Sequence, residues 1–91
     1  MIRSCADKDT QKLLARKFSK KLSAIERQAR VRLELLDAAT SLRDLGLLGL
    51  RLEALKGDRK GQYSIRINDR YRICFDWGDG DTYNVEIVDY H

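Results

Sequence analysis

Histidine and cysteine are scarce in this sequence, which has one histidine and two cysteines among its 91 residues. His91 is the single imidazole, and the scattered carboxylates lack ligand spacing, so we expect neither a metal site nor a cofactor. Cys5 and Cys74 also lack metal-ligand spacing. Small buried apolar positions are favoured over a disulfide or a reactive site for both cysteines.

Long apolar runs are missing as well, and none approaches the roughly 20 residues that a membrane-spanning helix needs. Residues 1–4 (MIRS) lack the apolar core of a signal peptide. We therefore expect a cytoplasmic protein without a membrane partner. With 43% hydrophobic and 35% charged residues, the chain is expected to form one small folded domain over residues 1–91.

Positive charge is concentrated in the first two thirds of the chain. Residues 1–60 hold 15 Lys/Arg against 8 Asp/Glu, a net of +7, whereas residues 61–91 hold 3 against 6, a net of −3. A cationic surface of this kind favours a polyanion, most simply nucleic acid, although basic helix faces are often only solvated.

A short strand at residues 1–4 and a helix over 8–17 are predicted first. Asp7 can cap this helix, because an aspartate oxygen accepts hydrogen bonds from the first free amides. The predicted apolar stripe of the helix consists of Leu13, Leu14 and Phe18.

The second predicted helix covers residues 23–45. Ser23 and Glu26 fit a capping box at its start, and Gly46 can adopt the left-handed conformation that ends it. Apolar residues recur every three or four positions, which places them on one face. An antiparallel helix pair is the expected result, and the apolar connection 46–50 should tuck its leucines beneath it.

Three alternating segments predict an antiparallel meander with strands over 63–67, 71–77 and 82–90. If residues 68–70 form the first hairpin loop, all large apolar groups of the first two strands lie on one face. The stretch from residue 51 is a further possible strand or a single turn.

The same register sets Arg66 opposite Arg72. Two opposed arginines repel each other, so the pairing costs stability unless an anion lies beside them. The alternative is that both reach into water and are screened. The preceding loop carries Lys56 and Arg59 with flexible backbone amides that could meet a phosphate, or it is only a connection.

The sequence ends with Asp89, Tyr90 and His91 after an apolar strand. Histidine exchanges protons near neutrality because its pKa is about 6.5, although a frayed terminus with a solvated histidine is the alternative. Attack of an RNA 2′-hydroxyl on the adjacent phosphate needs a base, cations for the phosphorane charge and an acid for the leaving 5′-oxygen, but no metal. These residues, with the cations of the loop and strands, supply such a set if they meet on the exposed face of the sheet.

Six short segments in order form a wider pattern: 1–4 (MIRS), 36–40 (LDAAT), 52–59 (LEALKGDR), 64–69 (SIRIND), 71–73 (YRI) and 88–91 (VDYH). The pattern resembles the HigB (plasmid-maintenance killer) branch of the RelE toxin superfamily over essentially the whole chain. The resemblance implies an α+β RelE-like fold, with an N-terminal strand and two antiparallel helices packed on a twisted, mainly antiparallel sheet.

The resemblance also implies a toxin of a type II toxin-antitoxin system. Such a toxin is a ribosome-dependent endoribonuclease (an mRNA interferase) that cuts messenger RNA in the decoding site of the small subunit. A cognate HigA-type antitoxin, a helix-turn-helix protein, holds it inactive. The alternative is a catalytically weak or inactive RelE-fold module that acts through antitoxin binding and autoregulation. A free RNase is disfavoured, because a set with one histidine gains most from a ribosome that orients the RNA.

The resemblance assigns the candidate catalytic residues by position. Lys56 matches the loop lysine, Arg72 the strand arginine, and Asp89, Tyr90 and His91 the C-terminal catalytic segment. We expect His91 or Asp89 to act as general base, Tyr90 to stack on a base or donate a proton, and Arg72 with Lys56 to bind the phosphate.

Further cations are candidates for RNA binding. Arg59 and Arg66 belong to the same loop and strand region, whereas Lys20, Lys21 and Arg27 belong to the basic helices. The helical cations can hold ribosomal RNA through phosphate contacts that depend strongly on salt. A solvated face that only keeps the protein in solution is the alternative for them.

Overall fold

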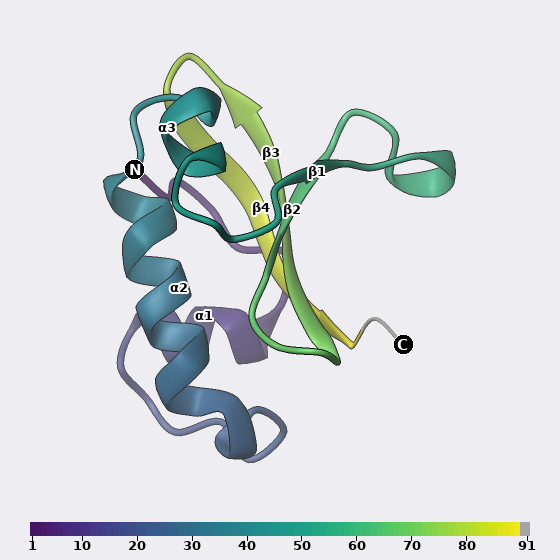
Figure 1. Cartoon of the computed structure of the whole chain (residues 1–91). Helices are drawn as coiled ribbons and strands as arrows, with labels where there is room; N and C mark the ends of the chain where they lie inside the picture. Colours follow the sequence, from purple (N-terminus) through teal and green to yellow (C-terminus); the bar gives the residue numbers. More distant parts are fainter. Residues whose placement is uncertain (90–91) are drawn as a thin grey trace.

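The computed structural model describes residues 1–89 and has helices on one side of an antiparallel sheet (Figure 1). The helical elements are α1 (Lys8–Leu14), the 3₁₀ turn η1 (Ser23–Ile25), α2 (Glu26–Ala38), α3 (Leu42–Gly46) and the 3₁₀ turn η2 (Gly57–Arg59). The strands are β1 (Glu53–Ala54), β2 (Tyr63–Arg66), β3 (Tyr71–Gly78) and β4 (Asp81–Asp89).

The sheet has the order β1-β2-β3-β4, and every neighbouring pair is antiparallel. Ile65 pairs with Ile73, and Ile73 pairs with Ile87 across the next ladder. All three are buried, because alternation along each strand sends them to the helix-covered face. The predicted register and the α+β class are therefore confirmed, and β1 adds a fourth strand where a strand or a turn was expected.

The outer edge of β4 is covered by the first ten residues of the chain. Backbone bonds run from Arg3 N to the Thr82 carbonyl (2.7 Å) and from Val85 N to the Ser4 carbonyl (3.0 Å). Where this segment leaves the edge, the buried Thr10 hydroxyl accepts from Ile87 N at 3.0 Å. The predicted N-terminal strand is thus present as two isolated parallel bridges to β4, and it protects an edge that would otherwise be open to pairing.

The β3–β4 hairpin turn and a bulge within β4 depend on residues that tolerate positive φ. Asp79 and Gly80 have φ values of 50° and 83°, as the central residues of a type I′ turn require. Asn84, with φ of 53°, forms a bulge in β4, since two residues, 84 and 85, face Phe75 alone. The bulge increases the twist that wraps the sheet around the helices.

The core lies between the sheet and α2. One side comes from the apolar face of α2 and its neighbours, as predicted by the three-to-four spacing. Its fully buried members are Leu13, Leu22, Ala29, Leu33, Leu36, Leu45, Ile65, Ile73, Phe75 and Val85. Cys74 is also buried, as expected, whereas Cys5 is half-buried, and both are free thiols.

The first helix begins as predicted and ends earlier. The Asp7 carboxylate accepts from Thr10 N at 3.2 Å, which is an N-cap. Arg16 then takes φ of 60°, and Lys17 N donates to the Lys12 carbonyl at 2.7 Å in a Schellman-type ending. The helix therefore stops at Leu14 instead of residue 17. The chain turns away there, so Phe18 is 67% exposed and the predicted stripe keeps only Leu13 in the core.

The second predicted helix is broken into two, which corrects the prediction of one helix over 23–45. Ser23 does not cap α2, because its hydroxyl donates to the Lys20 carbonyl. After Ala38 the backbone becomes extended, and Ser41 caps α3 by accepting from Asp44 N at 3.0 Å. A serine in this position competes with continued helix by binding a nearby backbone amide.

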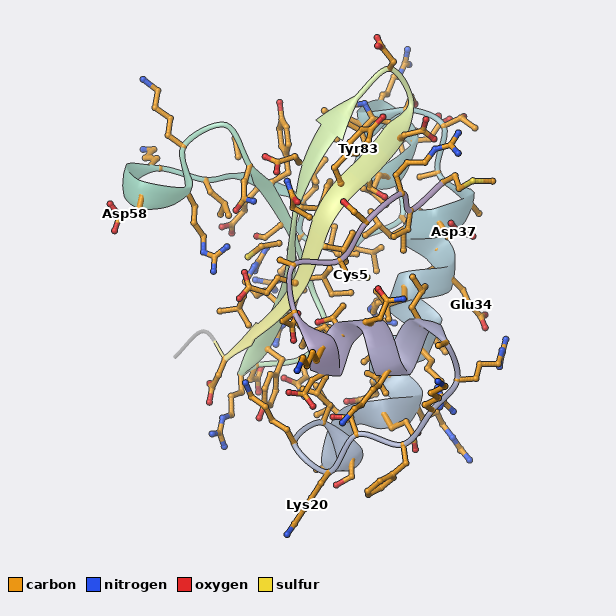
Figure 2. All side chains as sticks on the ribbon, turned by 180° about the vertical axis from the view of Figure 1, so that it is seen from behind. Cys5, Lys20, Glu34, Asp37, Asp58 and Tyr83 are labelled. Carbon is orange, nitrogen blue, oxygen red and sulfur yellow. The ribbon has the colours of Figure 1, made fainter. Side chains whose placement is uncertain are left out.

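Three further expectations about this region are wrong: the antiparallel helix pair, the left-handed conformation of Gly46 and the burial of the leucines that follow it. Helices α1 and α2 cross steeply and are not an antiparallel pair (Figures 1 and 2), because the early end of α1 redirects the chain. Gly46 is the last residue of α3, and Leu47 and Leu48, which follow it, are 75% and 50% exposed, so only Leu50 of that connection is buried.

Within residues 1–89, no helix has the length and apolar character needed to cross a bilayer.

The Thr10 hydroxyl gives a test of how β4 is held. Replacing Thr10 by Val leaves the buried Ile87 amide without its acceptor, so we expect unfolding in urea to require about 1–3 kcal/mol less free energy. The Ile87 amide should also exchange with solvent much faster in Thr10→Val. Thr10→Ser keeps the hydroxyl and should keep this amide protected; equal protection in both variants would contradict the assignment.

Candidate active site

The face of the sheet that the helices leave uncovered carries three of the predicted cations, Arg59, Arg66 and Arg72. Alternation along the paired strands sends to it the residues of two cross-strand rows. These rows are Glu53, Ser64, Cys74 and Glu86, followed by Arg66, Arg72 and Val88. We refer to this side as the open face.

Arg72 is largely buried on the open face, and its closest described contacts are with two neutral acceptors. Its Nε donates to Ser64 Oγ at 2.8 Å, and its Nη2 donates to the Arg51 carbonyl at 2.6 Å. The ion pair with Glu53 is longer, at 3.9 Å, and the Arg72 side chain is only 11% exposed. Neutral acceptors therefore help to orient the guanidinium in advance.

Arg66 lies directly opposite Arg72, as predicted. It is turned toward the carboxylate of Asp69, an ion pair whose acidic partner is 95% exposed. Both arginines line one pocket of about 320 Å³, together with Arg51, Glu53, Asn68 and Asp69. The repulsion expected from the register is thus reduced by the pairing of Arg66 with an exposed carboxylate.

Arg59 belongs to the same face and to a separate network. Its Nη2 contacts the Glu86 carboxylate at 3.1 Å, and its Nη1 donates to Gln62 at 3.0 Å. Cys74 lies beneath, and burial raises the pKa of its thiol. Arg59 therefore joins Arg72 on the open face as expected, with its charge paired to Glu86.

Lys56 stands apart from these arginines. It immediately precedes η2 in a loop that projects away from the sheet (Figure 1), and its exposed side chain makes no hydrogen bond or ion pair within residues 1–89. The structure thus does not bring Lys56 into contact with Arg72. Figure 2 places Asp58 at the tip of this loop.

Asp89 ends β4 and is bound by Arg70, a residue that we expected only to form a turn. Arg70 donates to Asp89 Oδ2 from Nε at 2.9 Å and from Nη2 at 2.6 Å, and these hydrogen bonds to the carboxylate raise the pKa of Arg70. Asp89 pairs with Tyr71, whereas Val88 pairs with Arg72, so alternation directs Asp89 away from the open face. Tyr90 and His91 lie outside the described residues, and their roles stay predictions.

The helical cations lie at another part of the surface. Lys20 and Lys21 are exposed in the connection before η1, and Arg27 is exposed in the first turn of α2. Figure 2 shows Lys20 at the end of the molecule, well away from Asp58. If these residues bind RNA, they do so separately from the arginines of the open face.

Sequence reasoning missed three contributors. Arg51 and Ser64 supply the acceptors of Arg72, and Arg70 holds Asp89. The position of Ser64 two residues before Arg66 in a predicted strand was a usable signal, because the two side chains share a face. No sequence pattern pointed to Arg51. Its backbone carbonyl accepts from Arg72, and Arg51 itself has a left-handed φ of 53°.

Helices on one face of an antiparallel sheet, with arginines held on the other, define a small α+β protein with an arginine-lined pocket. Residues 6–91 match the family model described as the RelE-like toxin of the type II toxin-antitoxin system HigB. The chain therefore belongs to this family, which confirms the family and fold that the sequence motifs predicted.

Two curated relatives agree with the family. The chain is 40% identical over 60 residues to "Endoribonuclease HigB" of Proteus vulgaris, an alignment that covers 66% of this chain and 65% of the relative. It is 46% identical over 64 residues to "Toxin HigB-1" of Vibrio cholerae serotype O1 (strain ATCC 39315 / El Tor Inaba N16961), covering 69% and 67%. The matched part thus spans about two thirds of each relative.

The contact between Ser64 and Arg72 can be measured as a coupling free energy. Ser64→Ala removes the Nε acceptor at a fully buried position, so we expect the free energy of unfolding to fall by about 1.5–3 kcal/mol. In an Arg72→Met background the same change should cost much less. Ser23→Ala, at an exposed hydroxyl, is the matched control; equal losses in both backgrounds would show that Ser64 does not position Arg72.

Proposed function

We propose that this chain is the endoribonuclease toxin of a type II toxin-antitoxin system and cuts messenger RNA on the ribosome. The relative from Proteus vulgaris is named an endoribonuclease, and the family is one of toxins. The observation that carries the proposal is the pair of opposed arginines on the open face, whose geometry suits a phosphate better than a neutral ligand.

The proposed reaction is attack of a 2′-hydroxyl on the adjacent phosphate. A base takes the hydroxyl proton, the new O–P bond forms, and an acid gives a proton to the departing 5′-oxygen, leaving a 2′,3′-cyclic phosphate. Arg72 and Arg66 bind the phosphate and stabilise the charge that develops on its oxygens. Because Ser64 and the Arg51 carbonyl already hold Arg72, little reorganisation is needed when the substrate binds.

Lys56 and the C-terminal segment complete the proposed site when RNA is bound. Within the described residues, the Lys56 side chain makes no hydrogen bond or ion pair that RNA binding would have to break. The loop can therefore bring its ammonium group to the phosphate. Asp89 already accepts from Arg70, which favours His91 as the general base and Asp89 as a group that supports the segment. Tyr90 then stacks on a base or donates the proton.

The proposed partners are messenger RNA, the decoding site of the small ribosomal subunit and a HigA-type helix-turn-helix antitoxin, all in the cytoplasm. The positive net charge of +4 supports the RNA partners. The competing proposal is a weak or inactive toxin that acts mainly through its antitoxin and regulation of its own promoter, and it predicts that the unmodified chain does not cut RNA.

Single-turnover cleavage on programmed ribosomes tests the catalytic assignment. His91→Gln should slow cleavage by about 10²–10⁴-fold and remove the limb of the pH–rate profile that belongs to the imidazole. Arg72→Gln should slow it by about 10²–10³-fold. Asp89→Asn tests whether Asp89 supports the segment or acts as the base. If Asp89 only supports the segment, the variant should keep the limb of the pH–rate profile that belongs to the imidazole.

Arg43→Gln on the exposed part of α3 is the matched control and should cleave as the unmodified chain does. If His91→Gln and Asp89→Asn both cleaved at the unmodified rate, the assignment of the proton-handling groups would be wrong. Absence of cleavage by the unmodified chain would favour the competing proposal.

The basic helical surface has its own test. Changing Lys20 and Lys21 together to Glu should weaken ribosome association and flatten its dependence on salt, because two phosphate contacts are lost. Both residues are exposed, so thermal unfolding should be unchanged. Unaltered association at physiological salt would leave these lysines as a solvated face.

A further inference from the structure

The outer edge of β2 changes partner halfway along its length. Strand β1 pairs with residues 63 and 64, and beyond them the connection between α3 and β1 takes over, with Arg66 N donating to the Leu50 carbonyl at 2.7 Å. Arg51 follows with φ of 53°, and its carbonyl accepts from Arg72. A residue other than glycine held in this conformation is often part of a functional site.

Two cationic pockets adjoin at this edge and share Arg51, Arg66 and Asn68. The first, of about 320 Å³, also contains Arg72 and is the site proposed for the reacting phosphate. The second, of about 290 Å³, adds Arg32 from α2 and the apolar walls of Leu50 and Ile67. The second pocket thus extends the cationic surface from the open face toward α2.

The residues that line the second pocket carry positive charge and no negative charge. Three arginines line it, and none of its lining residues is acidic; Arg66 also pairs with Asp69 of the first pocket. Arg32 is fixed by donating from Nε to the Arg66 carbonyl at 3.2 Å, which leaves its terminal nitrogens available to a ligand. The exposed Arg51 side chain has no hydrogen-bond or ion-pair partner in the part of the chain that the structure describes.

We propose that this second pocket is an anion subsite in which Arg51 and Arg32 bind an RNA phosphate next to the one that reacts. Gathered guanidinium groups repel one another unless an anion lies among them, and their planar forks suit phosphate oxygens. Because the two pockets share Arg51 and Arg66, a single strand can place successive phosphates in them. The subsite rests on the proposed function and adds Arg51 and Arg32 as positioning residues.

Neutral methylphosphonate linkages test the subsite on programmed ribosomes. The messenger carries one such linkage at a time, one or two positions to either side of a natural scissile phosphate, and single-turnover cleavage is measured at limiting protein. We expect one flanking substitution to slow the unmodified chain about tenfold, the effect of one charged hydrogen bond. On the natural messenger, Arg51→Gln should cleave about tenfold more slowly than the unmodified chain. The linkage that slows the unmodified chain should not slow Arg51→Gln any further.

The Arg51 side chain can be removed cleanly, because the carbonyl that binds Arg72 belongs to the backbone and the side chain has no described internal partner. Arg51→Lys should recover part of the rate and of the sensitivity to that linkage. Arg32→Gln should reproduce the effect of Arg51→Gln, whereas Arg43→Gln should behave as the unmodified chain.

Each other outcome overturns the subsite. If Arg51→Gln cleaves at the full rate, no flanking phosphate is bound there. The same follows if every methylphosphonate linkage slows Arg51→Gln by the same factor as it slows the unmodified chain. If inorganic phosphate inhibits through Arg51 while no linkage couples to it, the pocket takes free phosphate and not RNA. Failure of the unmodified chain to cleave would instead refute the proposed function, and the subsite with it.

Discussion

Burial of Ile65 against Ile73 is the constraint on which the site depends. Both side chains are fully buried beneath the helices, and strands alternate their side chains strictly, so this pairing also places Arg66 opposite Arg72 on the other face. The hydrophobic effect thus provides the free energy that brings two like charges together. Sliding the strands by one residue would separate the arginines only by exposing the isoleucines, so the cationic site and the core are inseparable.

The sheet could be predicted from the sequence because large apolar residues alternate with mostly polar ones along its first two predicted strands. The helices could be predicted only in part, since the three-to-four apolar spacing continues across the break between α2 and α3 and hides it. Ser41 followed by Asp44 carried the missing signal, in the form of an N-cap that competes with the longer helix. The exposed Phe18 was unpredictable for another reason: Arg16 takes a conformation that usually belongs to glycine.

The candidate site, too, could be predicted from the sequence only in part. The opposition of Arg66 and Arg72 follows from local alternation, and so it could be predicted. Contacts of Arg72 with the Arg51 carbonyl and of Arg32 with the Arg66 carbonyl join segments 21 and 34 positions apart. No pattern within one segment encodes such contacts, because the path of the α3–β1 connection decides them. Arg70 was overlooked since a turn residue is ordinarily assigned to geometry and not to chemistry.

The N-terminal residues on the edge of β4 impose an order on folding. Thr82 and Val85 must be available before residues 1–6 can pair, and the Thr10 hydroxyl must wait for Ile87. These contacts join parts of the chain about 80 positions apart, and such long loops close slowly. During synthesis, residues 1–6 therefore emerge long before Thr82 and Val85, and this ladder can form only after those later residues have been made.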